Sequence, residues 1–345
     1  MNRKTMRGGA FARVMTILVL LIVIAGLAYG VYDFNRFART PLQVTTQGDS
    51  IDIARGSGFR NIVTELQQRG LSETNGLYWR LLAEQTHVAG KLHAGEYAIN
   101  AGLTPRQLLA NMAAGKVMQR NFTIVDGWTF AELRQALATA DKLKHDSGAL
   151  DEVSLMQKIG ASGEAPEGRF LPETYAYVKG DSELDILKRA HGAMVKTLDA
   201  LWPLRDKDLP LATPNDALIL ASIVEKETGR PDERPRIAGV FVRRLEDHMM
   251  LQTDPSVIYG MGAQYTGNIH KTDLTTDTPY NTYTRAGLPP TPIALPGKPA
   301  IEAALHPSAG SDLYFVARGD GGHVFASTLE AHNRNVDCYQ RKHCQ

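Results

Sequence analysis

The stretch Thr213–Gly229, TPNDALILASIVEKETG, decides the fold of the larger part of this chain. Thr213 can cap a helix, Pro214 suits its first position, and Asp216 stands at the capping-box position that follows. Gly229 suits the left-handed position that closes a helix. Between these ends, residues 217–224 are apolar on almost every face, so the sequence predicts a largely buried helix.

Two carboxylates close this helix, Glu225 and Glu227, and they point about 200° apart because each helical residue turns by ~100°. Glu227 follows Leu220, Ile223 and Val224 at helical spacing. This apolar setting and the negative end of the helix dipole both disfavour the charged carboxylate. Both effects raise its pKa toward the value that a general acid needs near neutral pH, so Glu227 is the candidate catalytic residue.

An alternative is that both glutamates are solvated at the end of an ordinary helix. Glu225 could also be structural, pairing with Arg230 or Arg234. We nevertheless include Glu225 among the candidate substrate-binding residues.

The composition excludes several classes of protein. The chain has 345 residues, 38 Lys and Arg against 37 Asp and Glu, and a formal charge of +1. Domains usually contain ~100–200 residues, so the length predicts two modest folded units. Hydrophobic residues make up 43% and charged residues 22%, which excludes a disordered chain. With no basic excess and no basic run, the sequence indicates no nucleic-acid partner.

Cysteine and histidine patterns give no metal site. The two cysteines, Cys338 and Cys344, are too few for a thiolate zinc cluster or a dense disulfide framework. They form either a small disulfide loop in the tail at 338–345 or two free thiols, and their spacing does not decide between these. There is no HExxH motif, and the candidate histidines lack metal-ligand spacing on a helix, so we predict neither metal nor cofactor. These histidines are His270, His306, His323 and His332.

The N-terminal segment predicts a membrane anchor. Residues 14–32 are uncharged and apolar, and a helix needs ~20 such residues to cross the hydrocarbon core. The preceding residues 1–13 carry Arg and Lys but no acidic residue, so the positive-inside rule predicts a cytoplasmic N-terminus. The protein is then a single-pass protein of the inner membrane with its catalytic part outside the cytoplasm. The alternative is a cleaved signal peptide, whose apolar region is usually shorter.

Beyond the anchor, the pattern predicts an α+β fold. Residues 33–48 are mixed and polar and predict a linker. Over residues 49–125, short helical and β-like runs alternate and predict a small α/β module. Residues 126–337 predict a mixed α+β catalytic domain, in which 141–167 is a surface excursion and 182–202 a helix.

Loops after the Glu227 helix predict a groove for a hydroxyl-rich ligand. Residues 251–260, 280–283 and 287–293 are rich in large polar residues and are stiffened by proline. Aromatic rings cover the C–H faces of sugars, while amides and carboxylates bond hydroxyls. Ordinary turn chemistry explains the prolines but explains the run of large polar residues less well. The candidates for sugar contacts are Gln252, Asp254, Tyr259, Asn281 and Tyr283.

The order of motifs SIVEKETG, LQTDPSVIYG, YNTY, GLPPTPIALPG, AALHP, LYFVA and GGHVFASTLEAHN resembles the YceG-like family of endolytic murein transglycosylases (MltG), from about residue 45 to 337. The resemblance implies that 49–125 is a LysM-like peptidoglycan-binding module and that Glu227 is the catalytic glutamate. It also makes His323 and Asn333 candidates for the groove. The sequence departs from the family pattern at Arg243 and His306, where Asn is common, and in the cysteine tail.

The resemblance implies cleavage of the β-1,4 bond between MurNAc and GlcNAc in nascent peptidoglycan strands. Glu227 would act first as acid and then as base, and the product would carry a 1,6-anhydro end without consuming water. Two alternatives stay open: a hydrolase that pairs Glu227 with Asp254 or Glu173, and a non-catalytic wall-binding scaffold. The resemblance also implies glycan strand termination near the membrane, with peptidoglycan synthases or division proteins as partners.

Overall fold

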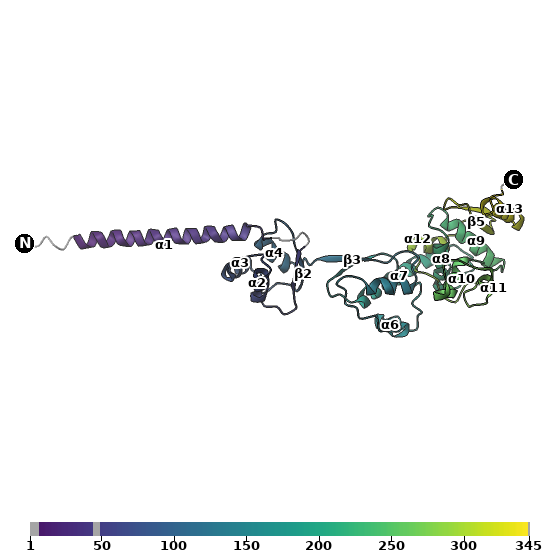
Figure 1. Cartoon of the computed structure of the whole chain (residues 1–345), viewed down its shortest axis with the longest axis horizontal. Helices are drawn as coiled ribbons and strands as arrows, with labels where there is room; N and C mark the ends of the chain where they lie inside the picture. Colours follow the sequence, from purple (N-terminus) through teal and green to yellow (C-terminus); the bar gives the residue numbers. More distant parts are fainter. Residues whose placement is uncertain (1–6, 44–48, 344–345) are drawn as a thin grey trace, which may run out of the picture. The chain divides into compact units, whose positions relative to one another are not determined.

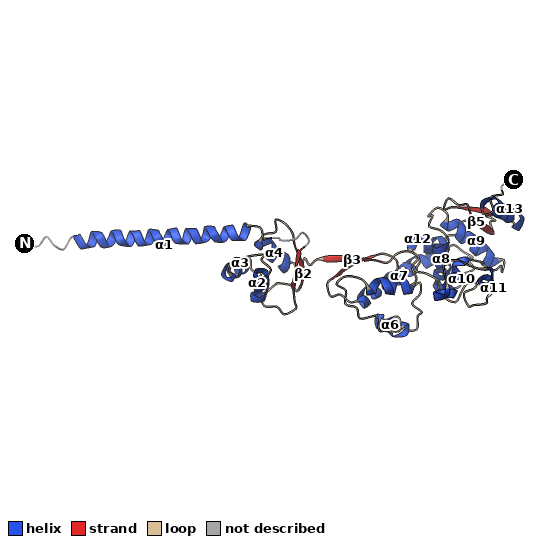
Figure 2. Cartoon of the chain, in the orientation of Figure 1, coloured by secondary structure: helices blue, strands red, loops and turns tan. Residues whose placement is uncertain are grey.

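The computed structural model of the chain describes residues 7–43 and 49–343, and its contacts divide the chain into two compact units, Met1–Gln119 and Arg120–Gln345 (Figure 1). Helices and strands both occur in each unit, and the fold is mixed α+β, as predicted (Figure 2). Among the described residues, strands pair two by two: β1 with β2, β3 with β4, and β5 with β6. The domain boundaries drawn from the sequence stay a prediction.

In unit 1, the described residues form a long N-terminal helix, three short helices and one antiparallel strand pair. Its elements are α1 (Arg7–Arg39), β1 (Asp49–Ile53), α2 (Phe59–Gln68), α3 (Gly76–Gln85), β2 (Gly95–Ile99) and α4 (Pro105–Ala113). In the strand pair, Ile51 lies opposite Tyr97, and both side chains are fully buried. Trp79 of α3 and Met112 of α4 pack in the same core.

Helix α1 is long and apolar enough to cross a membrane, with a mean hydropathy of 2.7 in its most apolar window. Its side chains along residues 11–28 are exposed. Residues 33–39, predicted as the start of a linker, instead continue this helix, because Phe34, Phe37 and Ala38 pack in the core of unit 1. Residues 44–48 of the predicted linker lie outside the described residues.

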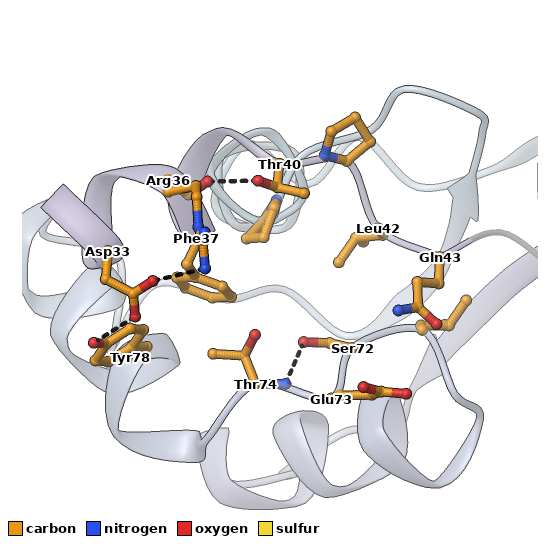
Figure 3. Close-up of a pocket in the computed structure, with 13 residues that line it drawn as sticks. Asp33, Arg36, Phe37, Thr40, Leu42, Gln43, Ser72, Glu73, Thr74 and Tyr78 are labelled. Carbon is orange, nitrogen blue, oxygen red and sulfur yellow. Dashed lines mark hydrogen bonds and ion pairs between the residues drawn. The ribbon is translucent and has the colours of Figure 1, made fainter.

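The C-terminal end of α1 forms one wall of a pocket of ≈ 480 Å³ in unit 1 (Figure 3). There the Asp33 carboxylate accepts a hydrogen bond from the Tyr78 hydroxyl at 3.0 Å and lies 2.9 Å from the Arg36 guanidinium. The Tyr78 ring also contacts Phe34 edge to face. These contacts hold the end of α1 against α3.

Unit 2 contains the remaining elements. They are β3 (Gln119–Thr123, which begins at the last residue of unit 1), α5 (Phe130–Ala138), α6 (Glu152–Ile159), β4 (Thr174–Val178), α7 (Glu183–Leu201), α8 (Pro214–Glu227), α9 (Arg234–Glu246), α10 (Asp254–Met261), α11 (Lys271–Thr275), α12 (Lys298–Leu305), β5 (Tyr314–Ala317), β6 (His323–Ala326) and α13 (Leu329–Tyr339), with short 3₁₀ turns at Trp202–Leu204 and Gly262–Gln264.

Helix α8 is the central rod of unit 2, as predicted. Every residue from 217 to 224 is buried, and the helix packs against α12 and α9. The capping box is present: the Thr213 hydroxyl accepts a hydrogen bond from the Asp216 N–H at 3.2 Å. The other end differs from the prediction. Gly229 does not take a positive φ, and the helix instead ends at Thr228 in an extended conformation.

Two segments predicted as irregular contain helices. Residues 251–260, predicted as a loop, contain all of α10 except its last residue, and Pro255 stands in the first turn of this helix. The predicted excursion at 141–167 contains α6, which is capped by the Asp151 side chain and buries Leu155 and Met156. In the tail, Cys338 lies in α13 and is disulfide-bonded, whereas Cys344 lies outside the described residues.

Candidate active site

Glu227 is the last residue of α8, so the buried helix carries its carboxyl group to the edge of the core. The residue is partly buried, and its carboxylate accepts a hydrogen bond from the Thr253 hydroxyl. Burial raises the pKa of Glu227 from 4.5 to about 7, and the Thr253 hydroxyl and the Arg244 charge oppose this rise only in part. At neutral pH a substantial fraction of Glu227 is therefore protonated.

Thr253, which the sequence analysis did not single out, is fixed by neighbouring hydroxyls. It is 2% exposed, and its N–H donates to the Thr282 hydroxyl at 3.0 Å. The hydroxyls of Thr282 and Ser256 lie 2.9 Å apart, and both residues are buried. This network fixes the position of the hydroxyl that donates to Glu227. In the sequence, what points to Thr253 is its position between two candidate residues, Gln252 and Asp254.

Arg244 of α9 places a positive charge beside the site. It is 7% exposed, and its guanidinium donates to the carbonyl oxygens of Leu313 at 2.7 Å and Leu251 at 2.8 Å. Burial lowers its pKa, and the guanidinium carbon lies 5.1 Å from the centre of the Tyr314 ring. The sequence contains no sign of this role, because the contacts with Leu313 and Tyr314 join residues that are far apart in the chain.

Glu227 opens into a cleft of ≈ 390 Å³, which we call the Glu227 cleft. Its walls come from the ends of α8 and α9, the start of α10, the loop at 283, strands β5 and β6, and α13. The structure brings four of the predicted contact residues into this cleft with Glu227: Gln252, Asp254, Tyr283 and His323. The other four, Glu225, Tyr259, Asn281 and Asn333, do not line it.

Asp254 and Tyr283 form a hydrogen-bonded pair across the cleft. The Tyr283 hydroxyl donates to the Asp254 carboxylate at 2.5 Å, and burial together with this carboxylate raises the pKa of Tyr283. Next to them, Gln252 is exposed and takes a φ of +51°, a conformation that few residues other than glycine adopt. Its N–H donates to the Thr282 carbonyl at 3.1 Å, which holds this conformation at the cleft.

Two histidines line the far wall of the cleft. His323 Nδ1 lies 2.7 Å from the carboxylate of Glu233, which also accepts the His323 N–H at 3.0 Å. His332 stacks on Tyr314 with ring centres 5.2 Å apart, and burial lowers its pKa, so its imidazole is neutral at neutral pH. The residue predicted from the sequence is Asn333, the next one along the helix. Adjacent helical residues point ~100° apart, and on α13 it is His332 that faces the cleft while Asn333 is exposed.

Glu225 takes the structural position that the sequence analysis left open. Its carboxylate lies 3.1 Å from the Arg234 guanidinium and accepts the Gly297 N–H at 3.0 Å. The Glu225 side chain is 5% exposed, and burial raises its pKa. Glu225 thus joins α8 to α9 and to the start of α12, on a different side of the helix from the cleft.

Asn281 supports a loop. It is 1% exposed, and its amide donates to the carbonyl of Thr276 at 2.7 Å and to those of Asp273 and Leu274 at 3.2 Å. Its side-chain oxygen accepts the Tyr283 N–H at 2.9 Å. The amide is therefore committed to backbone groups, and Asn281 acts by holding Tyr283 at the cleft.

Tyr259 lines a second cleft of ≈ 650 Å³, which we call the Tyr259 cleft. Its hydroxyl donates at 3.1 Å to Glu167, a carboxylate that is 7% exposed and also accepts the Phe130 N–H at 3.0 Å. Burial raises the pKa of Glu167 to about 7. Glu167 was not predicted from the sequence. Glu173, the candidate for a second hydrolytic carboxylate, is exposed and lines neither cleft.

Residues 51–338 match the YceG-like family. The chain belongs to the YceG-like family. Among curated proteins, it is 30% identical over 315 residues to the endolytic murein transglycosylase of Bacillus subtilis, with 84% of each chain covered. It is 28% identical to the endolytic murein transglycosylase of Streptococcus pneumoniae, covering 94% of this chain and 64% of that protein. The chain thus spans somewhat less than two thirds of the pneumococcal relative.

Among solved structures, this YceG-like chain is similar to a YceG-like protein of Listeria monocytogenes, with a TM-score of 0.52 and 28% identity. The match covers 84% of this chain and 99% of that one. The resemblance drawn from the motifs is therefore confirmed. Among the residues that the structure describes, no three His, Cys, Asp or Glu side chains are grouped so that they could hold a metal ion.

Proposed function

We propose that this chain is an endolytic murein transglycosylase, which cleaves the β-1,4 bond between MurNAc and GlcNAc inside peptidoglycan strands. The observation that carries the proposal is Glu227, a carboxyl whose pKa burial raises to about 7, at the wall of an open cleft with amide, phenol and carboxylate groups. The activity named for the relatives in Bacillus subtilis and Streptococcus pneumoniae supports it.

The reaction needs one carboxyl group that acts twice. Protonated Glu227 donates its proton to the glycosidic oxygen as the bond from that oxygen to C1 of MurNAc breaks. The resulting carboxylate then takes the proton of the C6 hydroxyl of the same MurNAc, whose oxygen bonds to C1. Glu227 is protonated again, the products are a free 4-hydroxyl and a 1,6-anhydro end, and no water is consumed. An attacking hydroxyl within the same sugar gains effective molarity over water.

Neighbouring side chains have supporting roles in this mechanism. Thr253 positions the Glu227 carboxyl and stabilises its ionised form between the two proton transfers. The buried Arg244 charge also favours that ionised form. Gln252, the Asp254–Tyr283 pair and His323 line the cleft and are the groups that would bond sugar hydroxyls.

A two-carboxylate hydrolase is the second candidate, because Asp254 lines the same cleft as Glu227. In that reaction Asp254 would activate water or form a covalent bond with the sugar. The close bond from Tyr283 to Asp254 favours a carboxylate engaged in binding over one that receives a proton from water. The raised pKa of Glu227 and its position in an open cleft favour an enzyme over a non-catalytic scaffold, which would need neither feature.

Mass spectrometry of the chain ends separates these candidates. Purified glycan strands are incubated with the full chain in detergent, and the new ends are identified. We expect 1,6-anhydro ends, which lack the elements of one water relative to reducing ends. New reducing ends would establish a hydrolase, and no new ends after long incubation would establish a scaffold.

We further propose that α1 anchors the chain in the inner membrane with its N-terminus in the cytoplasm. The apolar length of α1 and the basic residues before it support this topology. Unit 1 would bind peptidoglycan as a LysM-like module, and the enzyme would cut strands as synthases or division proteins deliver them. Protease added to intact spheroplasts should then remove both units, and full protection of the chain would contradict this topology.

A further inference from the structure

We propose that the Tyr259 cleft binds sugars of the same glycan strand at a distance from the bond that is cut. This inference rests on the proposed function, because it assigns a second binding region for that substrate. The Tyr259 cleft lies within unit 2, as the Glu227 cleft does. Its occupant would be an extended amino-sugar polymer.

The lining of the Tyr259 cleft has the chemistry that sugars need. Two aromatic side chains, Tyr259 and Tyr280, offer rings that can cover C–H faces of a sugar. Hydroxyls of Thr129 and Thr291 and the exposed carboxylate of Glu152 can bond sugar hydroxyls. Its volume of ≈ 650 Å³ is within the usual range for ligand sites of ~300–1,000 Å³.

The Tyr259 cleft is preformed. The Tyr259 and Tyr280 rings meet edge to face with centres 4.8 Å apart, and the hydroxyls of Tyr280 and Thr291 lie 2.9 Å apart. Glu167 connects two parts of the wall, because it accepts hydrogen bonds from the Tyr259 hydroxyl and from the N–H of Phe130, the first residue of α5. A wall held by such bonds loses little entropy when a ligand binds.

Two elements contribute to both clefts, so the clefts adjoin. Helix α10 carries Asp254 in the Glu227 cleft and Tyr259 in the Tyr259 cleft, and five residues of helix advance by only ~7.5 Å. The following loop carries Tyr283 in the first and Tyr280 in the second, and three residues span at most ~11 Å. Asp254 and Tyr259 point ~140° apart around α10, so a strand that reaches both clefts would curve around this helix.

An enzyme that cuts inside a strand must hold sugars on both sides of the bond that breaks. The Glu227 cleft, at ≈ 390 Å³, is the smaller of the two and leaves little room beyond the reacting sugars. Binding in the Tyr259 cleft would add affinity for long strands and would fix how far from a strand end the cut falls. Short fragments that do not reach it would gain nothing from it.

The test fills the Tyr259 cleft from an exposed position. Ala131 on α5 lines this cleft and is exposed, so Ala131→Trp should obstruct it without disturbing the core. Ala138→Trp is the matched control, because Ala138 is exposed on the same helix and lines neither cleft. The full chain of each variant is assayed on long, peptide-free glycan strands and on the shortest fragment that the wild type cleaves, and kcat/KM is measured for both.

For Ala131→Trp we expect the ratio of kcat/KM on long strands to that on the short fragment to fall about tenfold, mainly through KM. The cut positions along long strands should also become less regular. In Ala138→Trp the ratio should stay at its wild-type value. An unchanged ratio and unchanged cut positions in Ala131→Trp would overturn this inference while leaving the proposed function intact. No cleavage of either substrate by the wild type would overturn the proposed function itself.

Discussion

Glu227 and Glu225 leave the last turn of α8 on different sides, and their surroundings give them different chemistry. Glu225 meets Arg234 and the Gly297 N–H, so its carboxylate has partners that compensate its charge. Burial favours the protonated form of Glu227, and the Thr253 hydroxyl and the Arg244 charge offset this effect only in part. The helical period predicts that the two diverge. Which one faces a cleft depends on α9 and α10, which the local sequence does not specify.

Thr253 offers a test of how Glu227 is tuned. Its hydroxyl lowers the pKa of Glu227, so Thr253→Val should raise that pKa further above its present value of about 7. Activity depends on the protonated form, so the alkaline limb of the pH profile of kcat/KM should move to higher pH, by up to about one unit. Thr253→Ser keeps the hydroxyl and is the matched control, with its alkaline limb near that of the wild type. An alkaline limb that stays in place or moves to lower pH in Thr253→Val would contradict this role.

At the scale of elements, α8 shows which features of a helix the local sequence predicts. The capping residues predict its start, and the apolar run predicts its burial, and both are confirmed. Helix α10 was not predicted, because a short segment with Pro255 and Gly260 resembles turn sequence, and tertiary contacts decide its conformation. The burial of Arg244 likewise depends on a carbonyl almost 70 residues away, at Leu313.

The cap of α8 can be tested separately from the chemistry. Thr213 is exposed, so Thr213→Ala removes little besides the hydrogen bond from the Asp216 N–H. We expect a loss of about 1 kcal/mol in the free energy of unfolding of unit 2, measured by denaturant titration. Thr213→Ser keeps a capping hydroxyl and should retain most of the wild-type stability. Equal stability of all three proteins would show that the cap does not stabilise α8.

At the scale of the whole molecule, the sequence predicts the α+β class, the apolar N-terminal helix and the family, because each depends on local pattern or linked motifs. The extension of α1 to Arg39 was not predicted, because the mixed polar sequence after residue 32 is typical of a linker. In the structure, this segment is helical and packs Phe34, Phe37 and Ala38 in the core of unit 1. Four of the contact residues predicted from the sequence line the Glu227 cleft: Gln252, Asp254, Tyr283 and His323. The roles of Thr253, Arg244 and His332 were not predicted, because they depend on contacts that only the folded chain makes.

Stability gives a control for the central test. The folded-state pKa of Glu227, about 7, lies above the ordinary value of 4.5. The folded state therefore binds this proton more tightly, and its contribution to stability is lost as pH rises from 4.5 through about 7. Glu227→Gln replaces the carboxyl with a group that never ionises. Its melting temperature above pH 7 should equal or exceed that of the wild type.

The most direct test is therefore the formation of 1,6-anhydro ends by Glu227→Gln in the full chain, with purified glycan strands as substrate. We predict that the variant forms none while it remains folded, and that Glu173→Gln, a change at an exposed glutamate outside the cleft, retains wild-type activity. Formation of anhydro ends by folded Glu227→Gln at a rate near that of the wild type would contradict the account.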